Sequence, residues 1–286
     1  MRAGESSKGS IFDREWTDWI DSDDWRSAMD AVPMIPAVAR EVLEFANDRN
    51  VPVKRIVKVV SKDPILASRV LRLANSAYSG SAVQITSISG AIVRMGTEAV
   101  RNLVTATCVA SILADKGQGN AGRELVDHGI GTAYIASFIA DAAGESRDQA
   151  FVCGLLHDIG KLLVYHLAHH PHRGVRKPTG DELAAVMAKR HAEFGGLMME
   201  RWKMPAPLHE AVRFHHQPAL ADDPRPAAVT YAANRLAHQY GFGCKAENED
   251  LMSDPVFAGV NVQLGTLAHI KHQAPMLYEV ARQLNA

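Results

Sequence analysis

The sequence predicts an all-α protein, built as a two-lobe helical domain. Apolar residues recur at the three- and four-residue spacing of amphipathic helices, whereas alternating strand-like patterns are nearly absent. Apolar residues make up 47% of the 286 residues, a content typical of a chain that folds around a core. Prolines, glycines and helix-capping residues then divide the chain into separate helices.

The first half of the chain contains several helix start signals. Ser10 is placed to cap a helix in which Trp16 and Trp19 share one face, and a second helix is expected after the proline-containing segment 33–36. Asp63-Pro64 combines an N-cap side chain with a proline at the first helical position. The helices expected here cover about 38–45, 64–77, 87 or 89 to 96, and 97–114.

The polar, glycine-rich segment 116–122 is the best candidate for a linker between two subdomains. We therefore expect a disordered N-terminus at 1–10, an N-terminal helical subdomain at 11–115 and a second helical subdomain at 121–286. Residues 169–180 hold two prolines and two glycines and are expected to form an exposed loop. Further helices are expected at about 123–142, 147–167, 181–200, 206–215, 226–240 and 262–285.

Charge and cysteine use argue against several classes of protein. Lys plus Arg is 31 and Asp plus Glu is 32, so the net charge of −1 gives no support for nucleic acid or an acidic membrane as the main partner. Cys108, Cys153 and Cys244 are widely spaced and form no CxxC pair. Residues 1–10 lack a signal-peptide core, and no uncharged apolar run approaches the length that spans a bilayer. We expect a soluble, cytoplasmic protein.

The histidines carry the strongest chemical signal. Nine of the 13 lie between His157 and His216. His157-Asp158 follows the apolar run 151–156, and a buried carboxylate is costly unless a cation or metal pairs with it, although a hydrogen-bonded core pair is an equal alternative. Imidazole and carboxylate together suit Zn, Mn or Fe. Surface or capping roles are expected for His166, His169, His170, His172, His209, His238, His269 and His272.

These residues carry a resemblance to a known superfamily. The order of His128, His157-Asp158, His191 and His215-His216 is similar to the HD metal-dependent phosphohydrolases. The first half narrows this to the HDOD domain, an HD-related output domain of bacterial signalling proteins. The resemblance covers about 25–240, and the upstream motifs that carry it are Pro33-x-x-Pro36, Asp63-Pro64-x-Leu66, Arg69-x-Leu71, Leu73-Ala-Asn-Ser76 and Ile88-x-x-Ala91-Ile92-x-x-Met95-Gly96.

The resemblance implies a ligand set for one or two divalent ions, with Mn, Fe, Zn or Mg as candidates. It implies that His128, His157 and Asp158 hold one ion with a later aspartate, and that His191, His215 and His216 hold a second, bridged by Asp158. Asp158 would then be catalytic, and Lys161 would neutralise a substrate phosphate. An exposed lysine at a helix surface is the alternative for Lys161.

Two departures from the superfamily pattern weaken the enzyme interpretation. Asn234 stands where the later aspartate is expected, and it is either a weaker ligand or a residue of the helix surface. Gln217-Pro218 follows the histidine doublet, so the signature of the cyclic-dinucleotide phosphodiesterases is missing. Six candidate ligands and Lys161 are nevertheless retained, which favours bound metal.

The first hypothesis is therefore an output module of bacterial signal transduction that is not an efficient enzyme. It would pass a signal from a sensor kinase or a receiver-containing protein to another protein, as part of a response regulator system, with a residual pocket for metal or a phosphorylated small molecule. No receiver domain is expected in this sequence, because no parallel βα pattern occurs. The alternative is a metal-dependent phosphohydrolase that acts on a nucleotide or another phosphoester. A nucleic-acid-binding protein is disfavoured by the net charge.

Overall fold

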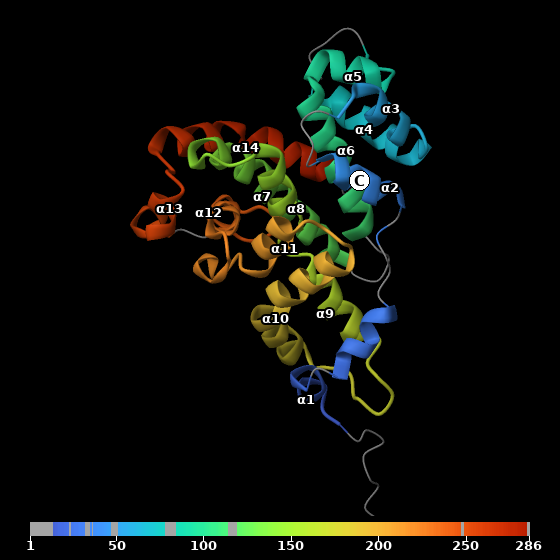
Figure 1. Ribbon diagram of the computed structural model, residues 1–286, viewed down its shortest axis with the longest axis vertical. Helices are drawn as coiled ribbons and strands as arrows, with labels where there is room; N and C mark the ends of the chain where they lie inside the picture. The colour runs from blue at the N-terminus through green and yellow to red at the C-terminus, as the bar shows by residue number, and fades with distance from the viewer. Residues whose placement is uncertain are drawn as a thin grey trace, which may run out of the picture.

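The computed structural model confirms the all-α prediction (Figure 1). It describes residues 14–22, 24–31, 35, 37–46, 51–77, 84–113, 119–246 and 249–284. Within these ranges there is no strand, and the pairing of Arg14 with Val175 is an isolated bridge. Ser10, Pro33 and Pro36, which were expected to cap or interrupt helices, lie outside the described residues.

Five helices form the lobe at the top of Figure 1, and their start signals work as predicted. Oδ1 of Asp63 accepts the backbone N–H groups of Ile65 and Leu66, and the hydroxyl of Ser87 accepts that of Gly90. The central helix of the lobe, α6, is buried along residues 101–110. The five helices are α2 (Ala37–Ala46), α3 (Val53–Val60), α4 (Pro64–Ala77), α5 (Ile88–Met95) and α6 (Thr97–Leu113).

A second group of helices forms the middle of the molecule around α7 and α8 (Figure 1). The last long helix packs along α7 and reaches α4, so it joins the two groups. Gly119 and Gly122 were expected in a linker, but they begin α7, and Gly122 is buried there. The helices are α7 (Gly119–Ala143), α8 (Arg147–Leu156), α9 (Gly160–His169), α10 (Gly180–Arg201), α11 (Ala206–Arg213), α12 (Pro224–Tyr240), α13 (Pro255–Gly259) and α14 (Leu264–Leu284).

The predicted helix over 147–167 is wrong in one respect, because the structure breaks it into α8 and α9 at residues 157–159. At the break α9 packs closely on α10. A Cβ atom at Gly160 would lie 1.9 Å from the carbonyl oxygen of His191 and 2.3 Å from the backbone nitrogen of Gly195. The stretch 147–169 also has the length and hydropathy of a membrane span, but 78% of its most apolar window is buried inside the protein.

The segment before α2 lies at the opposite end of the molecule from α3, α4 and α5 (Figure 1). It consists of α1 (Trp16–Asp21) and a short 3-10 helix (Asp24–Ala31). The rings of Trp25 and Phe194 are 4.5 Å apart, and Arg176 pairs with both Glu15 and Glu182. This segment therefore packs on α10, and the predicted division of the chain at about residue 115 remains a prediction.

Candidate metal centre

The middle group of helices brings all seven predicted metal ligands to one place. They come from α7 (His128), the α8–α9 turn (His157 and Asp158), α10 (His191), the end of α11 (His215 and His216) and α12 (Asn234). All of them are buried except His216, which is exposed. The centre is thus enclosed by helices and reaches solvent at His216.

Backbone carbonyl groups fix the orientation of the buried imidazoles. Nδ1 of His157 lies 2.7 Å from the carbonyl oxygen of Gly154, and Nδ1 of His191 lies 2.6 Å from that of Met187. His215 makes the same contact with a carbonyl of α11 at 2.6 Å. Because a carbonyl oxygen only accepts, the proton of each uncharged ring lies on Nδ1. Each Nε2 then presents a lone pair to the centre, as metal-binding histidines do.

The first cluster comprises His128, His157 and Asp158. Oδ2 of Asp158 lies 3.3 Å from Nε2 of His157 and 3.8 Å from Nε2 of His128. Nε2 of His157 is buried and makes no hydrogen bond. A buried nitrogen of this kind fits a metal ligand, because an unpaired polar atom in the interior is otherwise costly.

The second cluster comprises His191, His215 and His216. Nε2 of His191 lies 3.3 Å from Nε2 of His215 and 3.0 Å from Nε2 of His216. Oδ1 of Asp158 approaches the same nitrogens, at 3.2 Å from His191 and 4.0 Å from His215. Asp158 therefore lies between the clusters and turns one oxygen to each.

The charges around Asp158 favour its ionised form. Burial alone would raise the pKa of Asp158, but His157, when its ring is protonated, and Lys161 hold it well below its usual value. Nζ of Lys161 lies 2.6 Å from Oδ2 of Asp158. Burial, together with the neighbouring rings, lowers the pKa of His128 to about 3 and that of His216 to about 4. Uncharged rings beside a carboxylate are the state in which these groups bind a divalent ion.

Asn234 points into the centre, so its alternative assignment to the helix surface is wrong. Its side-chain amide lies 2.9 Å from Nε2 of His128, and the residue is 5% exposed. Nδ1 of the same ring lies 3.1 Å from the carbonyl oxygen of Phe242. Sequence reasoning missed His238, whose ring lies 4.5 Å from that of His128. Its spacing of four residues from Asn234 on α12 was the available signal.

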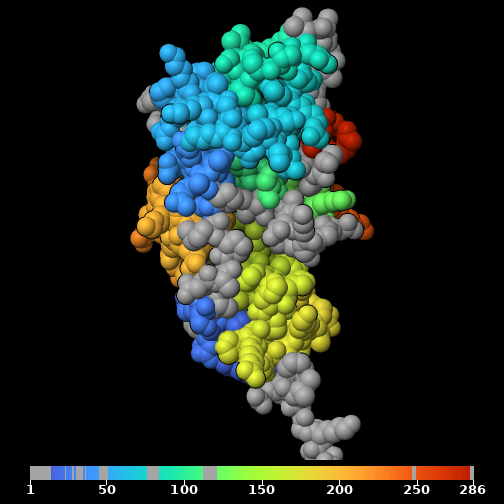
Figure 2. Space-filling model, turned by 90° about the vertical axis from the view of Figure 1, so that its right-hand side faces the viewer, coloured from blue at the N-terminus to red at the C-terminus, as the bar shows by residue number. Residues whose placement is uncertain are grey.

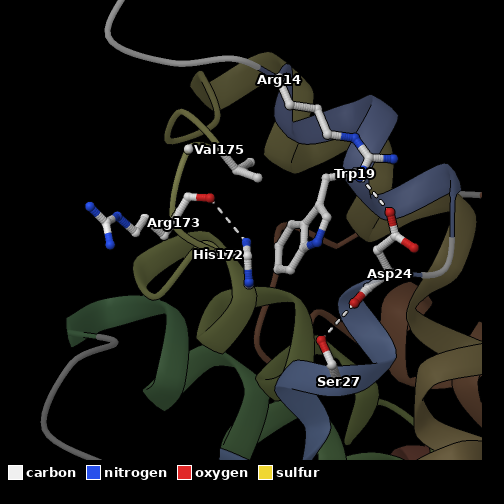
Figure 3. Close-up of a pocket in the computed structure, with 8 residues that line it drawn as sticks. Arg14, Trp19, Asp24, Ser27, His172, Arg173 and Val175 are labelled. Carbon is white, nitrogen blue, oxygen red and sulfur yellow. Dashed lines mark hydrogen bonds and ion pairs between the residues drawn. The ribbon is translucent and has the colours of Figure 1, made fainter.

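A separate cavity of about 570 Å³ lies between the N-terminal segment and the loop after α9 (Figure 3). Its walls include Trp19 and His172, and Arg14 forms an ion pair with Asp24 at 2.5 Å across one side. None of the metal-ligand candidates lines it. His172 therefore stays outside the centre, as expected, and neither cluster includes His166, His169, His170, His209, His269 or His272.

The fold and the site together define a helical protein with an HD-type arrangement, in which five histidines surround one aspartate. The model of the HDOD domain matches residues 32–218, and the chain belongs to this family. The match ends before Asn234 and the loop that contacts His128. The resemblance noted in the sequence is thereby confirmed.

Solved structures share the fold. A Geobacter sulfurreducens HDOD domain protein of unknown function is 20% identical, with a TM-score of 0.70 over 91% of this chain and 96% of that one. A Shewanella amazonensis protein provisionally named a phosphohydrolase is 24% identical, with a TM-score of 0.68 over 91% and 97%. A Marinobacter aquaeolei protein provisionally named a signal transduction protein is 18% identical, with a TM-score of 0.68 over 97% and 68%.

A curated relative from Treponema pallidum, itself uncharacterized, is 26% identical over 216 residues. The aligned region covers 71% of this chain and 41% of that protein, so the chain spans about two fifths of the relative's length.

Proposed function

We propose that this chain is a cytoplasmic, metal-binding output module of bacterial signal transduction. The metal centre would respond to an ion and a phosphorylated small molecule, and the helices at the top of Figure 1 would transmit that state to a partner. The expected partner is a sensor kinase or a receiver-containing protein of a response regulator system. Family membership and the signalling name carried by the Marinobacter aquaeolei protein support this proposal.

The main support for the proposal is that helix α8 connects the candidate metal centre to α6. Near its first turn, Asp148 pairs with Arg101 of α6, and both side chains are buried. At its last turn, α8 leads directly into His157 and Asp158. Ten helical residues span about 15 Å as a stiff rod. A change at the centre would therefore reach α6, which lies at the middle of the upper lobe.

The upper lobe also has the charge of a docking surface. Residues 37–113 hold ten Lys or Arg and five Asp or Glu, so the lobe is more basic than the near-neutral chain as a whole. Helices α3, α4 and α5 cover the upper part of the face in Figure 2. Val93 is 89% exposed and Ile65 is 68% exposed on the same lobe. Exposed apolar side chains among basic residues favour an acidic protein surface over nucleic acid.

A second candidate function is phosphoester hydrolysis. It is favoured by the position of Asp158, which turns one oxygen to each histidine cluster, and by Lys161 beside it. Divalent ions at such a site would polarise phosphate oxygens. Lys161 would add a positive charge where a phosphate binds. Asn234, which brings no negative charge, is the reason that we rank hydrolysis second.

Hydrogen exchange and turnover assays separate the two functions. We expect zinc to slow amide exchange in α6 and α8 of the wild-type protein, while α13, at the far side of Figure 1, stays unchanged. The Asp148→Asn variant should keep the change in the turn after α8 and lose it in α6. Hydrolysis of nucleotides or simple phosphoesters at about 1 s⁻¹ or faster would favour the second function instead.

A further inference from the structure

Building on the proposed function, we propose that this chain holds a single zinc-type ion at the second cluster, with Oδ1 of Asp158 as the fourth ligand. Asn234 and Lys161 keep the first cluster from holding another. The two clusters share the carboxylate of Asp158, so the position of a single ion depends on which of the two oxygens is free to bind it.

Asn234 brings no negative charge to the side of His128 that a metal would need. The carbonyl of Phe242 only accepts, so the proton of the uncharged His128 ring belongs on Nδ1, and Nε2 presents a lone pair to Oδ1 of Asn234, 2.9 Å away. A 180° turn of that amide presents its NH₂ group, which donates to Nε2. An aspartate would offer an ion a negative charge at this position, whereas Asn234 offers none, so an ion at the first cluster is held less strongly.

Lys161 occupies the oxygen of Asp158 that faces the first cluster. Its ammonium group lies 2.6 Å from Oδ2, closer than the rings of His157 at 3.3 Å and His128 at 3.8 Å. A divalent ion at the first cluster would have to displace this ammonium or lie beside it. Both cost free energy, because like charges repel strongly in a buried site.

The second cluster has neither obstacle. Oδ1 of Asp158 faces His191 at 3.2 Å, and the three imidazole nitrogens converge from the other sides. A tetrahedral ion with bonds of about 2.0–2.1 Å holds its ligand atoms roughly 3.3 Å apart. The separations of 3.3 Å and 3.0 Å around Nε2 of His191 are close to that spacing, and a shift of Asp158 would bring its Oδ1, now 4.0 Å from Nε2 of His215, to the same spacing.

The donor set also selects the kind of ion. Three imidazoles and one carboxylate suit zinc or cobalt, whereas magnesium prefers an octahedral shell of oxygens. His216 is exposed, so the second cluster is open to exchange with solvent ions. The first cluster, in contrast, is buried on every member.

Metal counting tests the inference without an activity assay. Purified protein is stripped with chelator, loaded with zinc and freed of unbound ion, and zinc per chain is measured by elemental analysis. We expect one ion in the wild type, one in His128→Gln and two in Asn234→Asp. His216→Ala should weaken zinc binding by roughly 100-fold, because it removes a direct ligand.

Asn234→Ala is the matched control, since it removes the amide without adding charge, and it should stay at one ion. Cobalt loading should give the intense visible bands of a four-coordinate ion, lost in His216→Ala and kept in His128→Gln. Two ions in the wild type, or zinc that is lost in His128→Gln and kept in His216→Ala, would overturn the inference alone. No ion in any variant would overturn the metal-binding function as well. If His128→Gln fails to fold, the comparison of Asn234→Asp with Asn234→Ala still decides.

Discussion

Nε2 of His191 lies 3.3 Å from Nε2 of His215, although each ring directs its Nδ1 toward a backbone carbonyl. In the uncharged rings two lone pairs therefore face each other, and such an arrangement repels. A cation between the nitrogens converts that repulsion into attraction. Because α10 and α11 pack directly on each other, the protein holds the two rings in place for the cation.

Zinc is therefore expected to raise the melting temperature of the wild-type protein. An ion at 100 times its Kd stabilises the folded state by about 2.7 kcal/mol, which corresponds to a shift of several degrees for a chain of this size. The shift should disappear in His191→Ala and on addition of chelator, as followed by calorimetry. His272→Ala, an exposed site on α14, should keep it. An equal shift in His191→Ala would place the stabilising ion elsewhere.

Gly160→Ala is expected to destabilise the protein by about 3 kcal/mol or more. The new Cβ would collide with backbone atoms of His191 and Gly195, which cannot move aside as a side chain can. Urea unfolding measures the loss. Gly265→Ala is the control, since nothing lies within 4 Å of its Cβ, and its stability should change by less than about 1 kcal/mol. Equal effects of the two substitutions would show that α9 and α10 are not held in this close contact.

The same glycine shows what the sequence could and could not predict. Apolar residues predominate over 150–165 and no proline interrupts them, so their local pattern indicates one unbroken helix. The break lies where α9 packs closely on α10, a helix that follows later in the chain, and this packing is not visible in the local pattern. Helix starts such as Asp63-Pro64 were predictable, because their hydrogen bonds involve neighbours in sequence.

Only part of the candidate metal centre could likewise be predicted from the sequence. The types of the candidate ligands and their order could be predicted from the sequence, because imidazole and carboxylate groups can bind metal wherever they occur in the chain. Their grouping into two clusters on either side of Asp158 depends on how α7, α10 and α12 pack. The inward position of Asn234 depends on that packing too, so the sequence alone does not distinguish it from a residue of the helix surface.

Loss of one partner of the buried Arg101–Asp148 pair should cost about 3–5 kcal/mol. Both residues are 3% exposed, so Asp148→Asn removes the negative charge that faces a buried guanidinium. Urea unfolding of Asp148→Asn measures the cost. Glu279→Gln, which removes the exposed pair with Arg282, is the control and should show no measurable change. The double variant Arg101→Met with Asp148→Leu should recover most of the stability. If it does not, the two side chains contribute to stability by more than neutralising each other's charge.

In the presence of chelator, the protein should lose stability as the pH falls from about 6.5 to about 4. The folded-state pKa is about 3 for His128 and about 4 for His216, below the ordinary value of 6.5, because burial and neighbouring rings disfavour the charged form. In this window the unfolded chain binds more protons than the folded one, so the free energy of unfolding rises with pH. Asp158, whose pKa is held below its usual value, adds a loss of the same sign only at lower pH.

Urea unfolding across this pH range measures the slope directly. His128→Gln removes one of the rings that titrates, so its slope should be shallower than that of the wild type. His272→Ala, which removes an exposed ring, should keep the wild-type slope. Zinc should steepen the dependence, because protons and the ion compete for the same nitrogens. A free energy of unfolding that stays flat through this range would mean that the rings are not buried uncharged, and the lone pairs assigned to the two clusters would not be available to a metal.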